Sequence, residues 1–200
     1  SGHFGGAVAN PINTLCSMLA QVIGEDGHIT IPHFYDDVEK VPAAEREMIA
    51  QIPFDEKKYM EAIGVKALKG EKGYSTLERN SCRPSFDICG IWGGYTGEGS
   101  KTVLPSKAYA KVSCRLVPHQ NHAVISQLFV DYIQSIAPEY VQVKVTPMHG
   151  GEGYVCPITL PAYQAAEKGF AKAFGKKPLA VRRGGSIPII SDFEQILGIK

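Results

Sequence analysis

Two stretches of the chain show the apolar periodicity of amphipathic helices. The first predicted helix, 10–23, starts at Asn10, a good N-cap, with Pro11 in the first helical position. Its apolar side chains recur every three or four residues and form one stripe. The same period appears over 121–136, and a further helix is expected over 162–174. The first two helices should each pack one face against a core.

Alternation of apolar and polar positions predicts strands elsewhere. It is clearest over 107–117, where Ala, Val, Cys and Leu alternate with Lys, Tyr, Ser and Arg. One face of this strand is expected to be buried and the other, which carries Arg115, to be polar. Shorter strands are predicted over 28–31, 86–92 and 141–145.

A polar segment, 32–80, separates the first predicted strand from the second. Short helices are predicted within it over 43–51 and 55–63, and its length and charge indicate a solvent-facing insertion. The order of elements predicts an α+β fold, a two-layer sandwich with helices on one face of an antiparallel sheet.

The character of the chain changes after Gly150. The stretch 150–161 is rich in Gly and Pro and is typical of a linker. A short strand over 179–181 and a last helix over 184–197 are predicted beyond it. Because these last 50 residues are too few for a core of their own, we expect one domain over residues 1–150 and part of a second over residues 151–200.

Composition narrows the class of protein. The apolar fraction of 44% is ordinary for a globular protein, and the formal net charge of +1 gives no electrostatic case for nucleic acid or an anionic membrane. No run approaches the roughly 18 apolar residues of a membrane span. The five cysteines are odd in number and form no CxxC motif, which favours reduced thiols and a cytoplasmic location.

The sequence gives little support for a nucleotide-binding site or a metal site. The Gly-rich stretch GGYTGEGSKT lacks a Lys directly after its last Gly, because Ser100 intervenes, and Pro105 interrupts any following helix. Of the six histidines, only His119 and His122 have ligand-like spacing. No carboxylate or thiolate beside them completes a zinc site, so we interpret them as solvated turn residues.

Two places suggest ligand binding. The planar fork of Arg115 could hold a carboxylate through two hydrogen bonds, although an ordinary solvated strand arginine explains the same pattern. In the segment 184–188, GGSIP, two glycines permit close approach of a ligand, and a helix that starts at Ser186 would present free amides to an anion. A helix connection capped by Ser is the alternative.

Four short motifs occur together in this chain: SGHFGG from Ser1, KTVLP from Lys101, RLVP from Arg115 and RRGGSIP from Arg182. In order and spacing they resemble the M20 metallopeptidases, in the branch of the cytosolic non-specific dipeptidase and carnosinase. The resemblance covers nearly the whole chain. It favours ligand binding at Arg115 and at GGSIP over the ordinary alternatives.

The resemblance implies that the intact protein is a zinc-dependent dipeptidase, a homodimer with two zinc ions per site that hydrolyses dipeptides or similar small substrates. Residues 1–150 would be its ferredoxin-like lid and dimerisation domain, and 151–200 the return into its α/β catalytic domain. The family's metal-binding segments and catalytic glutamate fall outside Ser1–Lys200, and His3 does not match the family's oxyanion histidine. No metal ligand or catalytic residue is therefore assigned, and the fragment alone is expected to be inactive.

The resemblance also implies substrate-binding roles. Arg115 resembles the lid arginine that binds the substrate's C-terminal carboxylate, and Thr102 resembles the lid threonine that contacts substrate. Gly185 and Ser186 resemble a substrate-binding pair of the catalytic domain. Lid contacts in this branch reach the partner subunit's active site. The alternative hypothesis is a non-catalytic ferredoxin-like module that dimerises or binds a small molecule.

Overall fold

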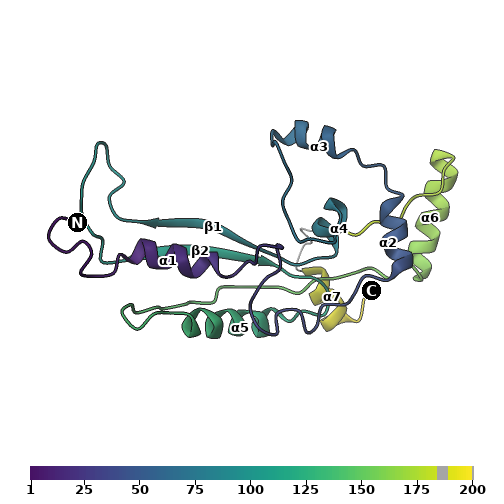
Figure 1. The fold of residues 1–200 in the computed structure, drawn as a ribbon. Coiled ribbons are helices and arrows are strands. Elements are labelled where there is room, and N and C mark those ends of the chain that lie inside the picture. The colour runs from purple at the N-terminus through teal and green to yellow at the C-terminus, as the bar shows by residue number, and fades with distance from the viewer. Residues whose placement is uncertain (184–188, 200) are drawn as a thin grey trace. The chain divides into compact units, whose positions relative to one another are not determined.

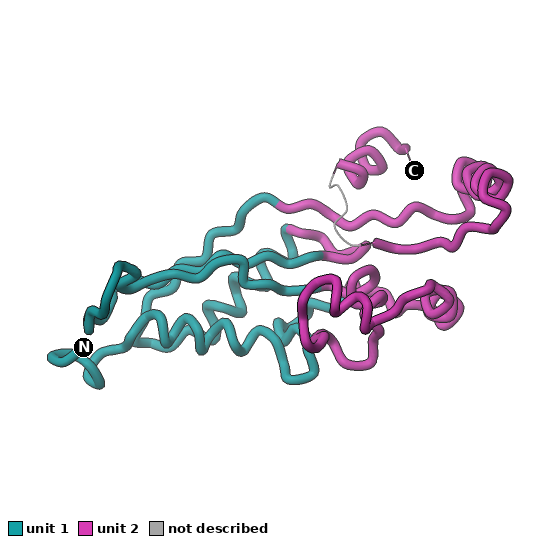
Figure 2. The backbone as a smooth tube through the Cα atoms, turned by 90° about the horizontal axis from the view of Figure 1, so that it is seen from above, with its two compact units in different colours: residues 1–36, 85–115, 123–149 teal, residues 37–84, 116–122, 150–200 magenta. Residues whose placement is uncertain are grey.

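The computed structural model describes residues 1–183 and 189–199, and the chain forms two compact units (Figure 2). The first, which we call the hairpin unit, consists of residues 1–36, 85–115 and 123–149. The second, the helical unit, consists of the remaining segments: 37–84, 116–122 and 150–200. Each unit is therefore assembled from segments that lie far apart in the sequence.

Helices and one antiparallel sheet make up the regular structure, which confirms the predicted α+β class (Figure 1). None of the helices in the described ranges is long and apolar enough to cross a membrane. In chain order the elements are α1 (Pro11–Ala20), α2 (Ala43–Ala50), α3 (Glu56–Ile63), α4 (Thr76–Ser81), β1 (Ser85–Gly93), β2 (Ala108–Arg115), α5 (His122–Ser135), α6 (Pro161–Phe174) and α7 (Ile189–Leu197).

Local capping explains where two of the predicted helices begin. The side chain of Asn10 accepts a hydrogen bond from the backbone N–H of Ile12 at 2.9 Å, at the start of α1. Asp55 caps α3 in the same way through the N–H of Lys58, at 3.1 Å. Helix α4 was not predicted from the apolar pattern, although Ser75 and Glu78 form a capping box there.

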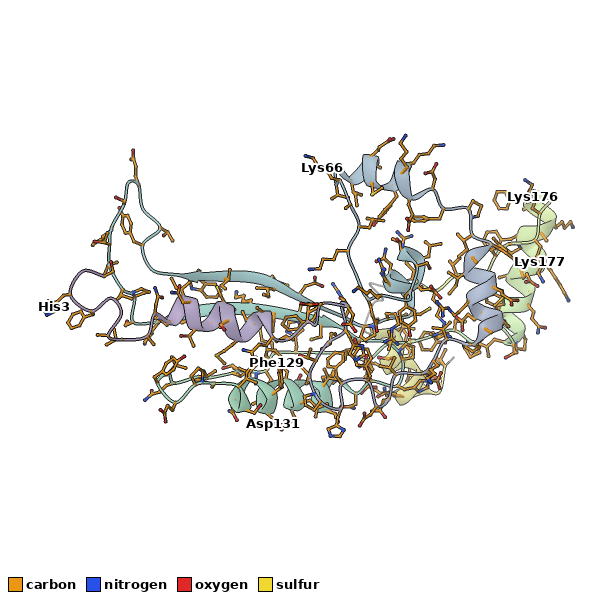
Figure 3. The ribbon with its side chains drawn as sticks, in the orientation of Figure 1. His3, Lys66, Phe129, Asp131, Lys176 and Lys177 are labelled. Atoms are coloured by element: carbon orange, nitrogen blue, oxygen red, sulfur yellow. The ribbon has the colours of Figure 1, made fainter. Side chains whose placement is uncertain are left out.

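The sheet of the hairpin unit consists of β1 and β2, paired antiparallel with Ser85 opposite Arg115. Helix α1 packs on β2. Helix α5 contributes Phe129, whose ring centroid lies 5.9 Å from that of Phe86 on β1. Figure 3 shows Phe129 on the sheet side of α5 and Asp131 on the opposite side. The predicted apolar face of this helix thus points to the sheet.

Three predicted strands do not form among the described residues. Ile29, within 28–31, makes only one isolated antiparallel bridge, with Ile23. The segments 141–145 and 179–181 have irregular backbone. Alternation reports which side chains could share a face, but a strand also needs a partner at hydrogen-bonding distance. No strand in the described ranges pairs with either segment.

Most side chains of the segment 32–80 are exposed, as predicted, but a few of them on α2 and α4 are buried. Ile49 on α2 is 4% exposed, and Thr76 and Glu78 on α4 are 7% and 4% exposed. Most of the segment belongs to the helical unit and contributes buried side chains to it. The sequence did not indicate this burial because charged residues are abundant in the segment. Several of these charges are paired inside the helical unit.

Arginine–carboxylate pairs hold α4 and the loop before it. The fork of Arg83 donates two hydrogen bonds of 2.7 Å to Glu71, and the two side chains are 8% and 11% exposed. The guanidinium of Arg83 also lies over the ring of Tyr74, 4.4 Å from its centroid. On α2, Arg46 binds Glu78 through Nε at 2.5 Å and Nη2 at 3.2 Å.

We expect the Glu78→Gln variant to lose stability in a pH-dependent way. Burial opposes ionisation of Glu78 and is the largest single influence, but hydrogen bonds from Arg46 and Ser75 together outweigh it and lower its pKa. A carboxyl whose pKa is lowered on folding stabilises the protein above its unfolded pKa, and this contribution disappears as pH falls through the folded value. The variant should therefore be less stable at pH 7, by about 1–3 kcal/mol.

Urea unfolding at pH 7 and at pH 3 measures this difference. The gap between the wild-type protein and Glu78→Gln should narrow at the lower pH. Glu61→Gln, at an exposed position on α3, is the matched control and should match the wild-type protein throughout. A gap of equal size at both pH values would contradict the prediction.

Candidate functional site

Arg115 ends β2 on the exposed face of the strand, as the alternation predicts. Its alternate neighbours on that face are Ser113 and Lys111. Within the described ranges, the Arg115 side chain has neither an ion-pair nor a hydrogen-bond partner. Its planar fork is therefore free to bind a carboxylate through two hydrogen bonds.

Thr102 lies in the loop that connects β1 to β2, and it is exposed. Its backbone carbonyl accepts a hydrogen bond from the backbone nitrogen of Ser1. Gly94, at the start of this loop, has a φ of 69°, and a Cβ atom there would lie 3.1 Å from the side chain of Ile12. The hairpin unit thus brings the first two motifs, SGHFGG and KTVLP, together.

The same unit keeps Thr102 away from Arg115. Strand β2 runs from Ala108 to Arg115, and seven steps at about 3.3 Å each make roughly 23 Å. Thr102 comes before the start of the strand, whereas Arg115 is its last residue. Two residues of an extended peptide span only about 7 Å. One dipeptide-sized ligand could not contact both side chains of a single chain.

The helical unit brings together parts of the other two motifs. Val117 and Pro118, the last residues of RLVP, line one small pocket with Arg182, the first residue of RRGGSIP. The other lining residues are Glu39, Lys40, Val41, Pro42, Cys82 and His119. Gly185 and Ser186, the predicted substrate-binding pair, lie outside the described residues.

A tight turn follows Arg115 and is fixed by a buried amide. Gln120 is 1% exposed, and its Oε1 accepts a hydrogen bond of 3.0 Å from the backbone N–H of Val117. The backbone N–H of Gln120 donates to the carbonyl of Val117 at 3.2 Å. His119, between them, has a φ of 75°, a left-handed conformation that costs about 1 kcal/mol or more for a residue with a side chain. The two hydrogen bonds between Gln120 and Val117 hold the turn in this conformation.

The segment after Gly150 packs against this turn. A Cβ atom on Gly153 would lie 2.9 Å from both the carbonyl carbon of Val117 and the nitrogen of Pro118. The carboxylate of Glu152 accepts hydrogen bonds from Asn121, at 2.8 Å, and from Gln195 on α7, at 2.5 Å. The stretch interpreted from its composition as a linker is therefore held in place at its first residues.

Potential metal ligands do not gather among the described residues. His119 Nε2 lies 3.3 Å from Glu39, and His122 Nδ1 lies 3.9 Å from Glu152. Throughout the part that the structure describes, no group of three His, Cys, Asp or Glu side chains could hold a metal ion. These residues therefore do not form a metal centre among themselves.

Burial disfavours the reactive thiolate form of two cysteines. All five cysteines are free. Burial raises the pKa of the Cys114 thiol to about 11, with a smaller contribution from Asp87, and burial also raises the pKa of Cys82. A nucleophilic cysteine needs a lowered pKa, so neither of these two thiols suits that role.

Comparison with known proteins identifies the chain. The family model of the peptidase dimerisation domain matches residues 1–141, which defines the class. The chain belongs to the M20 peptidase family, as the four motifs predicted.

Relatives in this family are similar along almost the whole chain. The Beta-Ala-His dipeptidase of Rattus norvegicus is 28% identical over 199 residues, which cover 98% of this chain and 40% of the relative. The Cys-Gly metallodipeptidase of Candida albicans is 30% identical over 205 residues, which cover all of this chain and 42% of the relative. The chain thus spans less than half the length of these curated relatives.

Two solved structures share the fold. An M20 family metallo-carboxypeptidase from Sulfolobus solfataricus superposes with a TM-score of 0.86 at 26% identity, covering 99% of this chain and 45% of that one. Human carnosine dipeptidase 1 gives a TM-score of 0.81 at 28% identity, covering 99% and 43%. The names of these relatives imply a metal-dependent enzyme.

The close packing of Gly153 yields a prediction about the turn after Arg115. Gly153→Ala should displace the Val117–Pro118 peptide, because the backbone atoms of that peptide leave no space for the added carbon. We expect a loss of about 1–3 kcal/mol of stability and faster hydrogen exchange at the amide of Val117. Gly169→Ala in α6, where nothing lies within 4 Å, is the control and should be neutral or slightly stabilising. Unchanged exchange at Val117 would show that the turn is not held by this contact.

Proposed function

We propose that this chain is the lid and dimerisation domain, residues 1–150, of a dinuclear zinc dipeptidase, together with the start of its returning catalytic segment, residues 151–200. The observation that carries the proposal is the free guanidinium of Arg115 at the end of β2, within the residues 1–141 that match the family model. Relatives named as dipeptidases support the reaction class. A cytoplasmic location is supported by the five free cysteines.

Substrate positioning is the contribution we assign to this chain. Arg115 would bind the C-terminal carboxylate of a dipeptide through its fork, and Gly185 and Ser186 would supply neutral donors to the same substrate. Such contacts favour the reaction by holding the scissile bond in place. They also reject a blocked C-terminus, because a neutral cap leaves the guanidinium without its partner.

Zinc chemistry in the proposed enzyme depends on residues other than those described here. When bound, two zinc ions would polarise the scissile carbonyl and activate water. The described residues of this chain hold no ligand cluster for them. Arg115, Thr102 and Ser186 would bind and orient substrate without taking part in the bond chemistry.

Dimer formation follows from the separation of Thr102 and Arg115. If both residues contact one substrate, they must come from different subunits, because about 23 Å of β2 separates their positions within one chain. The match to a peptidase dimerisation domain supports this arrangement. The alternative, a non-catalytic dimerisation or binding module, explains the domain match but gives no role to the free arginine of RLVP.

The first test removes the guanidinium in the full-length protein. Arg115→Ala should lower kcat/KM for a free dipeptide by about 2–4 kcal/mol, or roughly 30- to 900-fold, as for a lost hydrogen-bonded charge. Hydrolysis of the same dipeptide with an amidated C-terminus should change little. Lys111→Ala, four residues away on the same face, is the matched control. An unchanged kcat/KM for the free dipeptide would refute the role of Arg115.

The second test asks whether one active site uses two subunits. Homodimers of Arg115→Ala and of Thr102→Ala should both be impaired. A heterodimer of the two variants would contain one site with Arg115 and Thr102 both intact, and it should recover about half of the wild-type activity. The measurement is activity after subunit exchange between two differently tagged variants. If the two side chains served a site within one chain, mixing would restore nothing.

A further inference from the structure

A carboxylate lies next to Arg115 on the same face of the sheet. The register places Ser85 directly opposite Arg115. It places Asp87, two residues further along β1, opposite Ser113, and the shift in register comes only after Ile88. Directly opposed residues share a face of the sheet, and so do alternate residues of one strand. Asp87 is therefore the diagonal neighbour of Arg115, at a spacing of about 7–8 Å.

The Asp87 carboxylate is held by a neutral donor. Ser85 Oγ donates a hydrogen bond of 3.1 Å to Asp87 Oδ2, which also confirms that the two side chains share a face. Asp87 and Arg115 are both exposed, and among the described residues neither has an ion-pair partner. Two opposite charges thus lie side by side, and each can still bind a charged group of a ligand.

Another cation of this face is directed to an aromatic ring. Lys111 lies opposite Gly90, beyond the shift in register. Its Nζ lies 6.0 Å from the centroid of the Trp92 ring, and Trp92 stacks on Tyr109 with 5.3 Å between the ring centroids. Within the part of the chain that the structure describes, Lys111 makes no ion pair with Asp87. The carboxylate of Asp87 is therefore not neutralised from this side.

A ligand held by Arg115 extends over the same face. In the proposed function, the fork of Arg115 binds the C-terminal carboxylate of a dipeptide, and the last side chain branches from the carbon next to that carboxylate. A lysine side chain ends in an ammonium on a flexible four-carbon stem, so its charge can reach a neighbouring carboxylate. An acidic side chain would instead bring a like charge toward Asp87, which disfavours binding.

We infer that Asp87 is a specificity-determining residue, which favours substrates whose C-terminal residue has a cationic side chain and disfavours those with an acidic one. This inference rests on the proposed function and adds to it a class of substrate. Asp87 takes no part in the bond chemistry. Because both charges are exposed, the selectivity should be modest and should decrease as salt is added.

The test is Asp87→Asn in the full-length protein, with alanyl-lysine, alanyl-norleucine and alanyl-glutamate as substrates. Norleucine has the four-carbon chain of lysine without its charge. The ratio of kcat/KM for alanyl-lysine to that for alanyl-norleucine should fall about fivefold from its wild-type value, as for one lost exposed ion pair. The ratio for alanyl-glutamate to alanyl-norleucine should rise by a similar factor. Asp87→Lys should change both ratios further in the same directions.

Asp131→Asn is the matched control. Asp131 is also exposed and also accepts a hydrogen bond from a neutral donor, Gln127 Nε2, at 2.7 Å. It lies on the side of α5 away from the sheet (Figure 3). The variant removes the same charge from the hairpin unit and should leave both ratios at their wild-type values. An equal change in this control would overturn the inference, because net charge would then explain it.

The remaining outcomes separate this inference from the proposed function. A uniform loss of kcat/KM for all three dipeptides in Asp87→Asn would indicate a structural role and overturn the inference. If Arg115→Ala impairs the enzyme and both Asp87 variants keep the wild-type ratios, the inference fails and the proposed function stands. If Arg115→Ala leaves turnover of the free dipeptide unchanged, the proposed function itself fails.

Discussion

The antiparallel pairing of β1 and β2 is the constraint on which the proposed site depends. Its ladder fixes Arg115 at one end of an eight-residue strand, opposite Ser85, and places the loop that bears Thr102 beyond the other end. A ladder cannot shorten without breaking its hydrogen bonds, so the separation is a property of the fold. Two residues that serve one small ligand must then come from two copies. Dimerisation becomes a geometric condition for a complete site.

The helical unit is ordered by a different kind of contact. Three arginine–carboxylate pairs, with Arg46, Arg83 and Arg182 as donors, join its segments. Its last two helices contribute few buried side chains: Phe174 on α6 is 73% exposed and Ile196 on α7 is 77% exposed. Where apolar burial is small, paired charges give orientation without adding much stability.

The sequence predicted those parts of the fold that depend on near neighbours. Caps such as Asn10 and Asp55 act within three residues of themselves, so the helix starts were readable. Helix α4 was missed because six residues are too few to show a period, although its capping box from Ser75 to Glu78 was a signal that could have found it. The segment 141–145 alternates like a strand but finds no partner strand in the described ranges, and pairing is not a local property.

The residues of the candidate site likewise fall into those that a local sequence pattern predicts and those that it does not. Arg115 could be chosen from alternation and from a motif of four residues. Nothing local distinguishes Gln120, a polar residue in a turn between His119 and Asn121, yet it is among the most buried side chains of the chain. Its importance comes from the peptide of Val117, whose N–H it satisfies in a place that water does not reach. Equally, no local pattern links Asp87 to Arg115, because they become neighbours only when β1 pairs with β2.

Selectivity in the proposed enzyme would come from a difference in pairing between Arg115 and three other arginines of the chain. Arg46, Arg83 and Arg182 are bound to carboxylates of the chain itself, and an arginine that already has such a partner gains little from a second one. Arg115 has no such partner within the described ranges. A ligand with a free terminal carboxylate satisfies it, whereas a ligand with a neutral end displaces its water and offers no charge in return. In the proposed enzyme, a preference for free dipeptides would then come from the one guanidinium among these four that has no partner in the described ranges.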